Sequence, residues 1–123
     1  MGDEHLSLVG TALLVEDNAI IAMDADQMLR GLGFENVVTV SSVTSAAKAL
    51  ETTELTFALL DINLGSETSM PIANSLAEKG VPFVFASGYG DGADLPEAHA
   101  NVAVVTKPYS ADQVRSIASG KTD

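Results

Sequence analysis

The stretch LTFALLDINL, Leu55 to Leu64, decides the fold class of this chain. It is apolar almost without interruption until it reaches an acid, Asp61. A strand with one face in water alternates apolar and polar residues, whereas a parallel strand covered on both faces is apolar nearly throughout. We therefore interpret residues 55–64 as a buried strand of a parallel sheet, and the apolar part of this strand ends at Asp61.

Segments of the same apolar character recur along the chain, and segments with helical spacing of apolar residues separate them. The expected strands cover residues 11–17, 36–42, 55–64, 81–88 and 101–109. The expected helices cover residues 18–33, 43–53, 69–80 and 110–119, with a short, poorly amphipathic helix over 93–100. This alternation predicts an α/β fold, a doubly wound five-stranded parallel sheet with helices on both faces and right-handed crossovers.

Composition narrows the class of protein further. The 123 residues suffice for one domain, and the absence of cysteine excludes disulfides and thiolate metal sites. The net charge of −11 argues against binding to nucleic acid or to anionic membranes. No signal peptide is visible, and no apolar run approaches the roughly 20 residues of a membrane span. We expect a cytoplasmic monomer.

Polar residues stand where the expected strands end. Glu16 and Asp17 close the first strand, Asp61 the third, Ser87 the fourth and Lys107 the fifth. Taken singly, each has an ordinary structural role as a helix cap, loop carboxylate, turn serine or surface lysine. Ligands of open parallel sheets, however, bind beyond the carboxyl ends of the strands, so these residues are expected to share one site.

Such a site combines acids, a hydroxyl and a cation. Converging carboxylates repel one another, and oxygen ligands without cysteine suit a hard ion such as Mg²⁺. The ion, the lysine and the hydroxyl together suit a phosphoryl group. A carboxylate in such a site can itself be the nucleophile and become an acyl phosphate.

The motifs LLVEDN, LLDINL, ASG and TKPY, in this order and spacing, resemble the receiver domains of two-component response regulators. The resemblance runs from about Thr11 to the end of the chain, and FASGYG is similar to the signature of the FAT GUY receiver subfamily. It implies a flavodoxin-like sheet with strand order 2-1-3-4-5. It also implies a stand-alone receiver domain over residues 1–123, with a core of about 11–119, short tails and no output domain.

The resemblance also assigns roles to residues around the acids. Asp61 would accept the phosphoryl group from a phosphohistidine of a sensor kinase. Glu16, Asp17, Asp61 and Asn63 would hold Mg²⁺, Asn63 through its backbone carbonyl. The only chemistry implied is self-catalysed phosphotransfer and autodephosphorylation, so no enzyme in the usual sense is expected.

The remaining assignments concern the phosphoryl group itself. Lys107 would pair with its oxygens, Ser87 would close on it, and Gly88 would keep the neighbouring position small. The resemblance further implies a cis peptide bond between Lys107 and Pro108, an isomer that X-Pro bonds reach at low cost.

Two positions depart from the pattern of the family. Val104 stands where receivers usually carry an aromatic switch residue, and Gly65 stands where a proline is common, which predicts a looser loop. We hypothesise that Tyr89 reorients with Ser87 in place of the missing aromatic. The alternative is that Tyr89 packs statically over its loop.

Two other functions stay open from the sequence, namely an aspartyl-phosphate phosphatase and a binding module that is not phosphorylated. The phosphatase would need a second Asp two residues after the first, and the first strand ends EDNA instead. The expected partners are a sensor histidine kinase, with the HWE type among the candidates, and a downstream protein that the sequence does not name. The segment 87–109 is the expected docking face for that protein.

Overall fold

In the computed structural model, the residues whose structure is described are 9–64, 67–87, 104–106, 112 and 114. They form a five-stranded sheet with the order β2-β1-β3-β6-β7, and every neighbouring pair is parallel. The strands are β1 (Thr11–Val15), β2 (Asn36–Val40), β3 (Phe57–Asp61), β6 (Phe83–Ser87) and β7 (Val104–Thr106).

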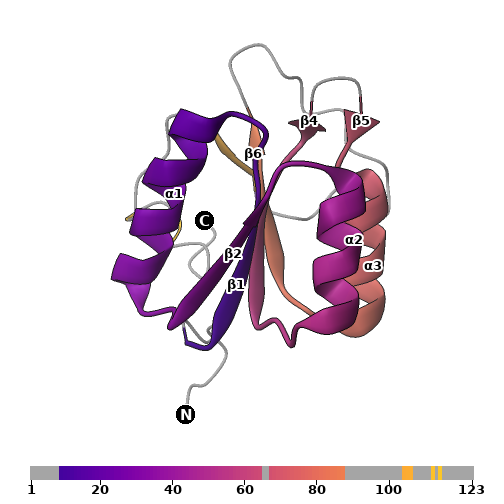
Figure 1. Cartoon of the computed structure of the whole chain (residues 1–123), viewed down its shortest axis with the longest axis horizontal. Helices are drawn as coiled ribbons and strands as arrows, with labels where there is room; N and C mark the ends of the chain where they lie inside the picture. The colour runs from indigo at the N-terminus through magenta and orange to yellow at the C-terminus, as the bar shows by residue number, and fades with distance from the viewer. Residues whose placement is uncertain (1–8, 65–66, 88–103, 107–111, 113, 115–123) are drawn as a thin grey trace.

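Helices cover both faces of this sheet. Helix α1 (Ala19–Leu32) lies on one face, and α2 (Val43–Thr52) and α3 (Met70–Lys79) lie side by side on the other (Figure 1). The core is accordingly divided in two. Leu59 faces the α1 side, whereas its neighbour Leu60 belongs to the cluster that contains the apolar residues of α2 and α3.

The central strand β3 has the double burial that its composition predicts. All five of its residues, FALLD, are buried, because successive side chains point to opposite faces and a helical layer covers each face. On the α1 side the rings of Phe34 and Phe57 stack with centroids 5.5 Å apart. The prediction of a doubly wound parallel sheet is therefore confirmed.

The structure also adds an element that the sequence patterns do not predict. Two short strands, β4 (Asn63–Leu64) and β5 (Glu67–Thr68), pair in antiparallel fashion directly after β3. The predicted strand 55–64 is thus wrong in extent, because β3 itself begins at Phe57 and ends at Asp61. With this hairpin set aside, the five long strands follow the expected order in chain sequence, the expected fourth and fifth strands being β6 and β7.

The helix ends follow from local chemistry. Asn18 is the N-cap of α1, where its side chain accepts hydrogen bonds from the N–H groups of Ile20 and Ile21. Gly80 ends α3 in a left-handed conformation with φ 74°, which glycine adopts without strain.

The end of the chain is described at few positions. The expected helix over 93–100 and most of 110–119 lie outside the described residues. Within 110–119, Asp112 and Val114 are helical, and Val114 is fully buried on the α1 side of the core.

Candidate functional site

The acids of the first and third strands meet at one end of the sheet. Val15 pairs with Leu60 across β1 and β3, so the residues that follow, Glu16 and Asp61, stand at neighbouring strand ends. One carboxylate oxygen from each of Glu16, Asp17 and Asp61 lies within 4.8 Å of the other two. Glu16 and Asp61 are only 3% and 4% exposed, whereas Asp17 is exposed.

Backbone hydrogen bonds hold this acidic group in place. The N–H of Glu16 donates to the carbonyl of Val40 at 3.0 Å, which ties the end of β1 to β2. The N–H of Asn18 donates to Oε2 of Glu16, also at 3.0 Å. The two acids that follow β1, Glu16 and Asp17, therefore lie in a turn whose backbone is held at both ends.

The donor set of the acidic group fits a hard divalent ion. Carboxylates at this separation repel one another, most strongly where they are buried, and a cation between them offsets the repulsion. Oxygens bound to one Mg²⁺ at ~2.1 Å lie roughly 3–4 Å apart, so three oxygens confined within 4.8 Å need only small side-chain adjustments. Together with the absence of cysteine, this donor set suits Mg²⁺ better than a softer metal.

The other expected site residues belong to strands that end beside Asp61. Asp61 pairs with Ala86, and Ser87, the last residue of β6, pairs with Thr106 of β7. Lys107 follows Thr106 in the chain. The backbone of Ser87 is described and its side chain is not, and the same holds for Asn63. Gly88, Tyr89, Lys107 and Pro108 lie outside the described residues, so their roles and the cis bond stay predictions.

The hairpin after Asp61 connects the site to the far helical layer. The N–H of Ser69 donates to the carbonyl of Ile62 at 3.0 Å and closes the hairpin at its base. The Glu67 carboxylate accepts a hydrogen bond from the N–H of Val43, the first residue of α2. Residues 65–66 lie outside the described ranges, so the looser loop predicted from Gly65 stays a prediction, and the residues on either side of it pair as β4 and β5.

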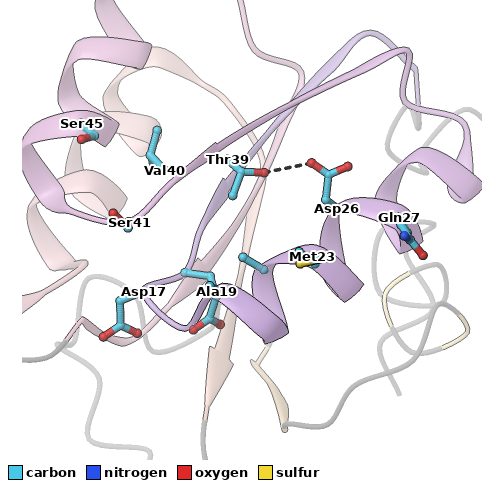
Figure 2. Close-up of a pocket in the computed structure, with 11 residues that line it drawn as sticks. Asp17, Ala19, Met23, Asp26, Gln27, Thr39, Val40, Ser41 and Ser45 are labelled. Atoms are coloured by element: carbon cyan, nitrogen blue, oxygen red, sulfur yellow. Dashed lines mark hydrogen bonds between the residues drawn. The ribbon is translucent and has the colours of Figure 1, made fainter.

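A groove of about 770 Å³ adjoins the acidic group between α1 and the end of β2. Asp17, Ala19 and Met23 line it from the side of α1, and Thr39, Val40 and Ser41 from the side of β2 (Figure 2). Across it, the Thr39 hydroxyl donates to Asp26 at 3.1 Å, and Asp26 also pairs with Arg30 at 2.6 Å. The sequence patterns do not reveal this groove, because it depends on how α1 packs beside the sheet edge.

Val104 stands at the position where the resemblance to receiver domains leads us to expect an aromatic switch residue. Val104 begins β7, pairs with Phe85 and is 36% exposed. Valine is stiff at χ1, so its side chain cannot make the large rotation of an aromatic ring.

Among the described residues, no helix is long and apolar enough to cross a membrane.

Comparisons with known proteins agree with this arrangement. Residues 12–119 match the family model of the response regulator receiver domain. The solution structure of SdrG from Sphingomonas melonis Fr1 is similar at 35% identity, with 89% of this chain and 92% of that chain covered and a TM-score of 0.74. A CheY-like receiver domain from Methylobacillus flagellatus is similar at 27% identity, with 89% and 95% covered and a TM-score of 0.74.

A receiver protein from Sinorhizobium medicae WSM419 shares the fold at 24% identity and a TM-score of 0.72, with 89% of this chain and 91% of that chain covered. Among curated protein sequences, none matches this chain. The family model nevertheless covers nearly the whole chain, and the acidic group stands at the strand ends where the receiver pattern expects it. The chain belongs to the family of response regulator receiver domains.

Proposed function

We propose that this chain accepts a phosphoryl group on Asp61 from a sensor histidine kinase in the presence of Mg²⁺. The observation that carries the proposal is the convergence of Glu16, Asp17 and Asp61 within 4.8 Å at the carboxyl ends of two adjacent parallel strands. These three side chains and the backbone carbonyl of Asn63 would hold the ion. When bound, Mg²⁺ would neutralise charge on the phosphoryl oxygens.

In the transfer step, a carboxylate oxygen of Asp61 attacks phosphorus, and the bond from phosphorus to the kinase imidazole breaks. The imidazole nitrogen keeps the electron pair of that bond, and Asp61 becomes an acyl phosphate. Hydrolysis later returns the carboxylate and releases inorganic phosphate. Because Asp61 is 4% exposed and ends the central strand, the donor would have to approach it from beyond the carboxyl ends of the strands.

Three further residues complete the proposed chemistry. Lys107 would pair with the phosphoryl oxygens, and the Ser87 hydroxyl would donate a hydrogen bond to one of them. Gly88 would leave space for the group beside the backbone. The support is the pairing of β3, β6 and β7, which ends these strands next to one another at the edge where Asp61 stands.

Incubation with phosphoramidate and Mg²⁺, followed by intact mass measurement, tests the proposal directly. The wild-type chain should gain one phosphoryl group, and Asp61→Asn should gain none. Glu78→Gln, which removes one exposed negative charge near the end of α3, is the matched control and should be labelled like wild type. Absence of labelling with any donor would instead favour a binding module that is not phosphorylated.

We further propose that the kinase docks on the start of α1. Ile20 and Met23 are 74% and 65% exposed there, beside Asp17, and large apolar side chains in water favour a protein contact. The double variant Ile20→Asp, Met23→Asp should lose transfer from a kinase and keep labelling by phosphoramidate. Val9→Asp is the control, since Val9 is 56% exposed and precedes β1, at the other end of the sheet.

The finer family placement is also a proposal. The FASGYG segment supports a FAT GUY-type receiver, and β6 ends in its Phe85, Ala86 and Ser87. Phosphotransfer from a panel of purified kinases that includes HWE-type enzymes tests this placement. Preferred transfer from the HWE type would support it, and equal transfer from unrelated kinases would contradict it.

We propose that the output of this receiver is phosphorylation-dependent docking of a downstream protein on the segment 87–109.

A further inference from the structure

The turn between β1 and α1 is organised by one residue, Asn18. Its backbone N–H donates to Oε2 of Glu16 at 3.0 Å. Its side-chain oxygen accepts from the N–H groups of Ile20 and Ile21 at 3.0 and 3.1 Å, and its carbonyl accepts from Ala22 at 2.9 Å. Asn18 is therefore bonded to the acidic group on one side and to the first turn of α1 on the other.

Asp17 lies between two fixed neighbours. On its amino side, Glu16 is tied to the carbonyl of Val40 in β2 at 3.0 Å. On its carboxyl side, Asn18 has the extended conformation of an N-cap, with φ −90° and ψ 117°. The Asp17 side chain is exposed, so its direction toward the other acids depends on the backbone of this turn rather than on packing.

The turn also has to hold Asp17 against the electrostatic repulsion of the other two carboxylates. Three carboxylates within 4.8 Å repel one another, and the exposed Asp17 is the member with the most freedom to move away. Without the side-chain acceptor of Asn18, the first N–H groups of α1 lose their partner and the end of the helix frays. Fraying would free the backbone of Asp17, and the acids would separate.

We propose that Asn18 is a positioning residue, which holds Glu16 and Asp17 in the arrangement that a divalent cation needs. The inference rests on the cation site of the proposed function and adds a residue that does not itself bind the ion. It predicts that the N-cap of α1 contributes to cation affinity as well as to stability. Ser42, the N-cap of α2, bonds within its own helix and to neither Glu16 nor Asp17, so it should contribute to stability alone.

Mn²⁺ binding, measured by electron paramagnetic resonance of the free ion, separates the effect on cation affinity from the effect on stability. Measured well below the unfolding temperature, Asn18→Ala should weaken binding roughly threefold to tenfold, the factor that corresponds to the loss of a typical N-cap. Asn18→Ser, which keeps a capping oxygen, should bind nearly as wild type. Asn18→Gly, which removes the acceptor but costs little helix stability at an N-cap, should weaken binding less than Asn18→Ala.

Ser42→Ala is the matched control. Ser42 is the N-cap of α2 and accepts from the N–H of Ser45 at 3.1 Å, so its loss should lower stability about as much as Asn18→Ala. Its Mn²⁺ affinity should be that of wild type. The inference is overturned if Asn18→Ala and Asn18→Gly both bind Mn²⁺ as wild type does, which would leave Asn18 as a helix cap only.

The behaviour of the wild-type chain distinguishes failure of the inference about Asn18 from failure of the proposed function. If the wild-type chain binds no Mn²⁺, the cation site itself is wrong and the inference falls with it. If wild type binds Mn²⁺ and is labelled by phosphoramidate while the Asn18 variants retain full affinity, the proposed function stands and only the role of Asn18 is lost.

Discussion

The Glu67 carboxylate in β5 accepts a hydrogen bond of 3.2 Å from the backbone N–H of Val43, the first residue of α2. These residues are 24 positions apart in the chain. The contact places a negative charge at the positive end of a helix dipole, and it joins the hairpin that follows Asp61 to the helical layer of α2 and α3.

Replacing Glu67 should measurably weaken the fold. Glu67→Ala removes a charge from the start of α2 and should lower the free energy of unfolding by ~0.5–1 kcal/mol, an effect that shrinks in high salt. Glu67→Gln, which keeps an acceptor oxygen, should lose less. Urea unfolding at two salt concentrations measures both variants.

The control for this prediction is Glu78→Ala. Glu78 lies in the last turn of α3, where a negative charge is unfavourable, so its removal should be neutral or slightly stabilising. Equal losses at the two positions would show that the contact with Val43 contributes nothing of its own.

Two exposed glycines should respond in opposite directions to alanine. Gly31 lies inside α1 with open space where the methyl group of alanine would stand, so Gly31→Ala should stabilise the protein by ~0.5–1 kcal/mol. Gly80 has equal space but a φ of 74°, so Gly80→Ala should cost roughly 1 kcal/mol. Thermal unfolding of the two variants checks the signs, and the same sign for both would contradict the argument.

Mg²⁺ should stabilise the wild-type chain and not the variant Asp17→Asn. A ligand that binds only the folded state at a hundredfold excess over its Kd adds ~2.7 kcal/mol to the free energy of unfolding. Without Mg²⁺, Asp17→Asn should be at least as stable as wild type, because one of three mutually repelling carboxylates is neutralised. Urea unfolding with and without Mg²⁺, at matched ionic strength, measures both effects.

Stabilisation of Asp17→Asn by Mg²⁺ to the same extent as wild type would exclude Asp17 as a ligand. Glu78→Gln, with one exposed charge removed outside the acidic group, should retain the full response to Mg²⁺.

Tyr89 should be required for the response to phosphorylation if it replaces the aromatic that is absent at Val104. In that case Tyr89→Ala should take up phosphate normally but lose the spectral changes that phosphorylation causes in β6 and β7, while Tyr89→Phe should retain them. Nuclear magnetic resonance of backbone amides before and after labelling measures the response. Unchanged spectral differences in Tyr89→Ala would indicate that the ring only packs against its loop.

The predictability of the fold differs from element to element. The double burial of β3 follows from its composition, because an uninterrupted apolar run has no face suited to water. The hairpin 63–68 escapes prediction, since strands of two residues are too short for any periodicity to appear in the sequence. Asn18 is a possible cap of α1 by its residue type, but its bond to Glu16 cannot be foreseen because a side-chain direction decides it.

The sequence by itself determined the layers of this protein and the end of the sheet at which its acids gather. Apolar periodicity and strand-end residues are local properties, and the rule for parallel strands turns them into one shared edge. Only the tertiary structure decided that Glu16 and Asp61 are buried while Asp17 is exposed, that Glu67 reaches Val43, and that a groove opens beside Asp17. These features depend on how separate elements pack against one another, and packing distances are not encoded in the spacing of residues along one segment.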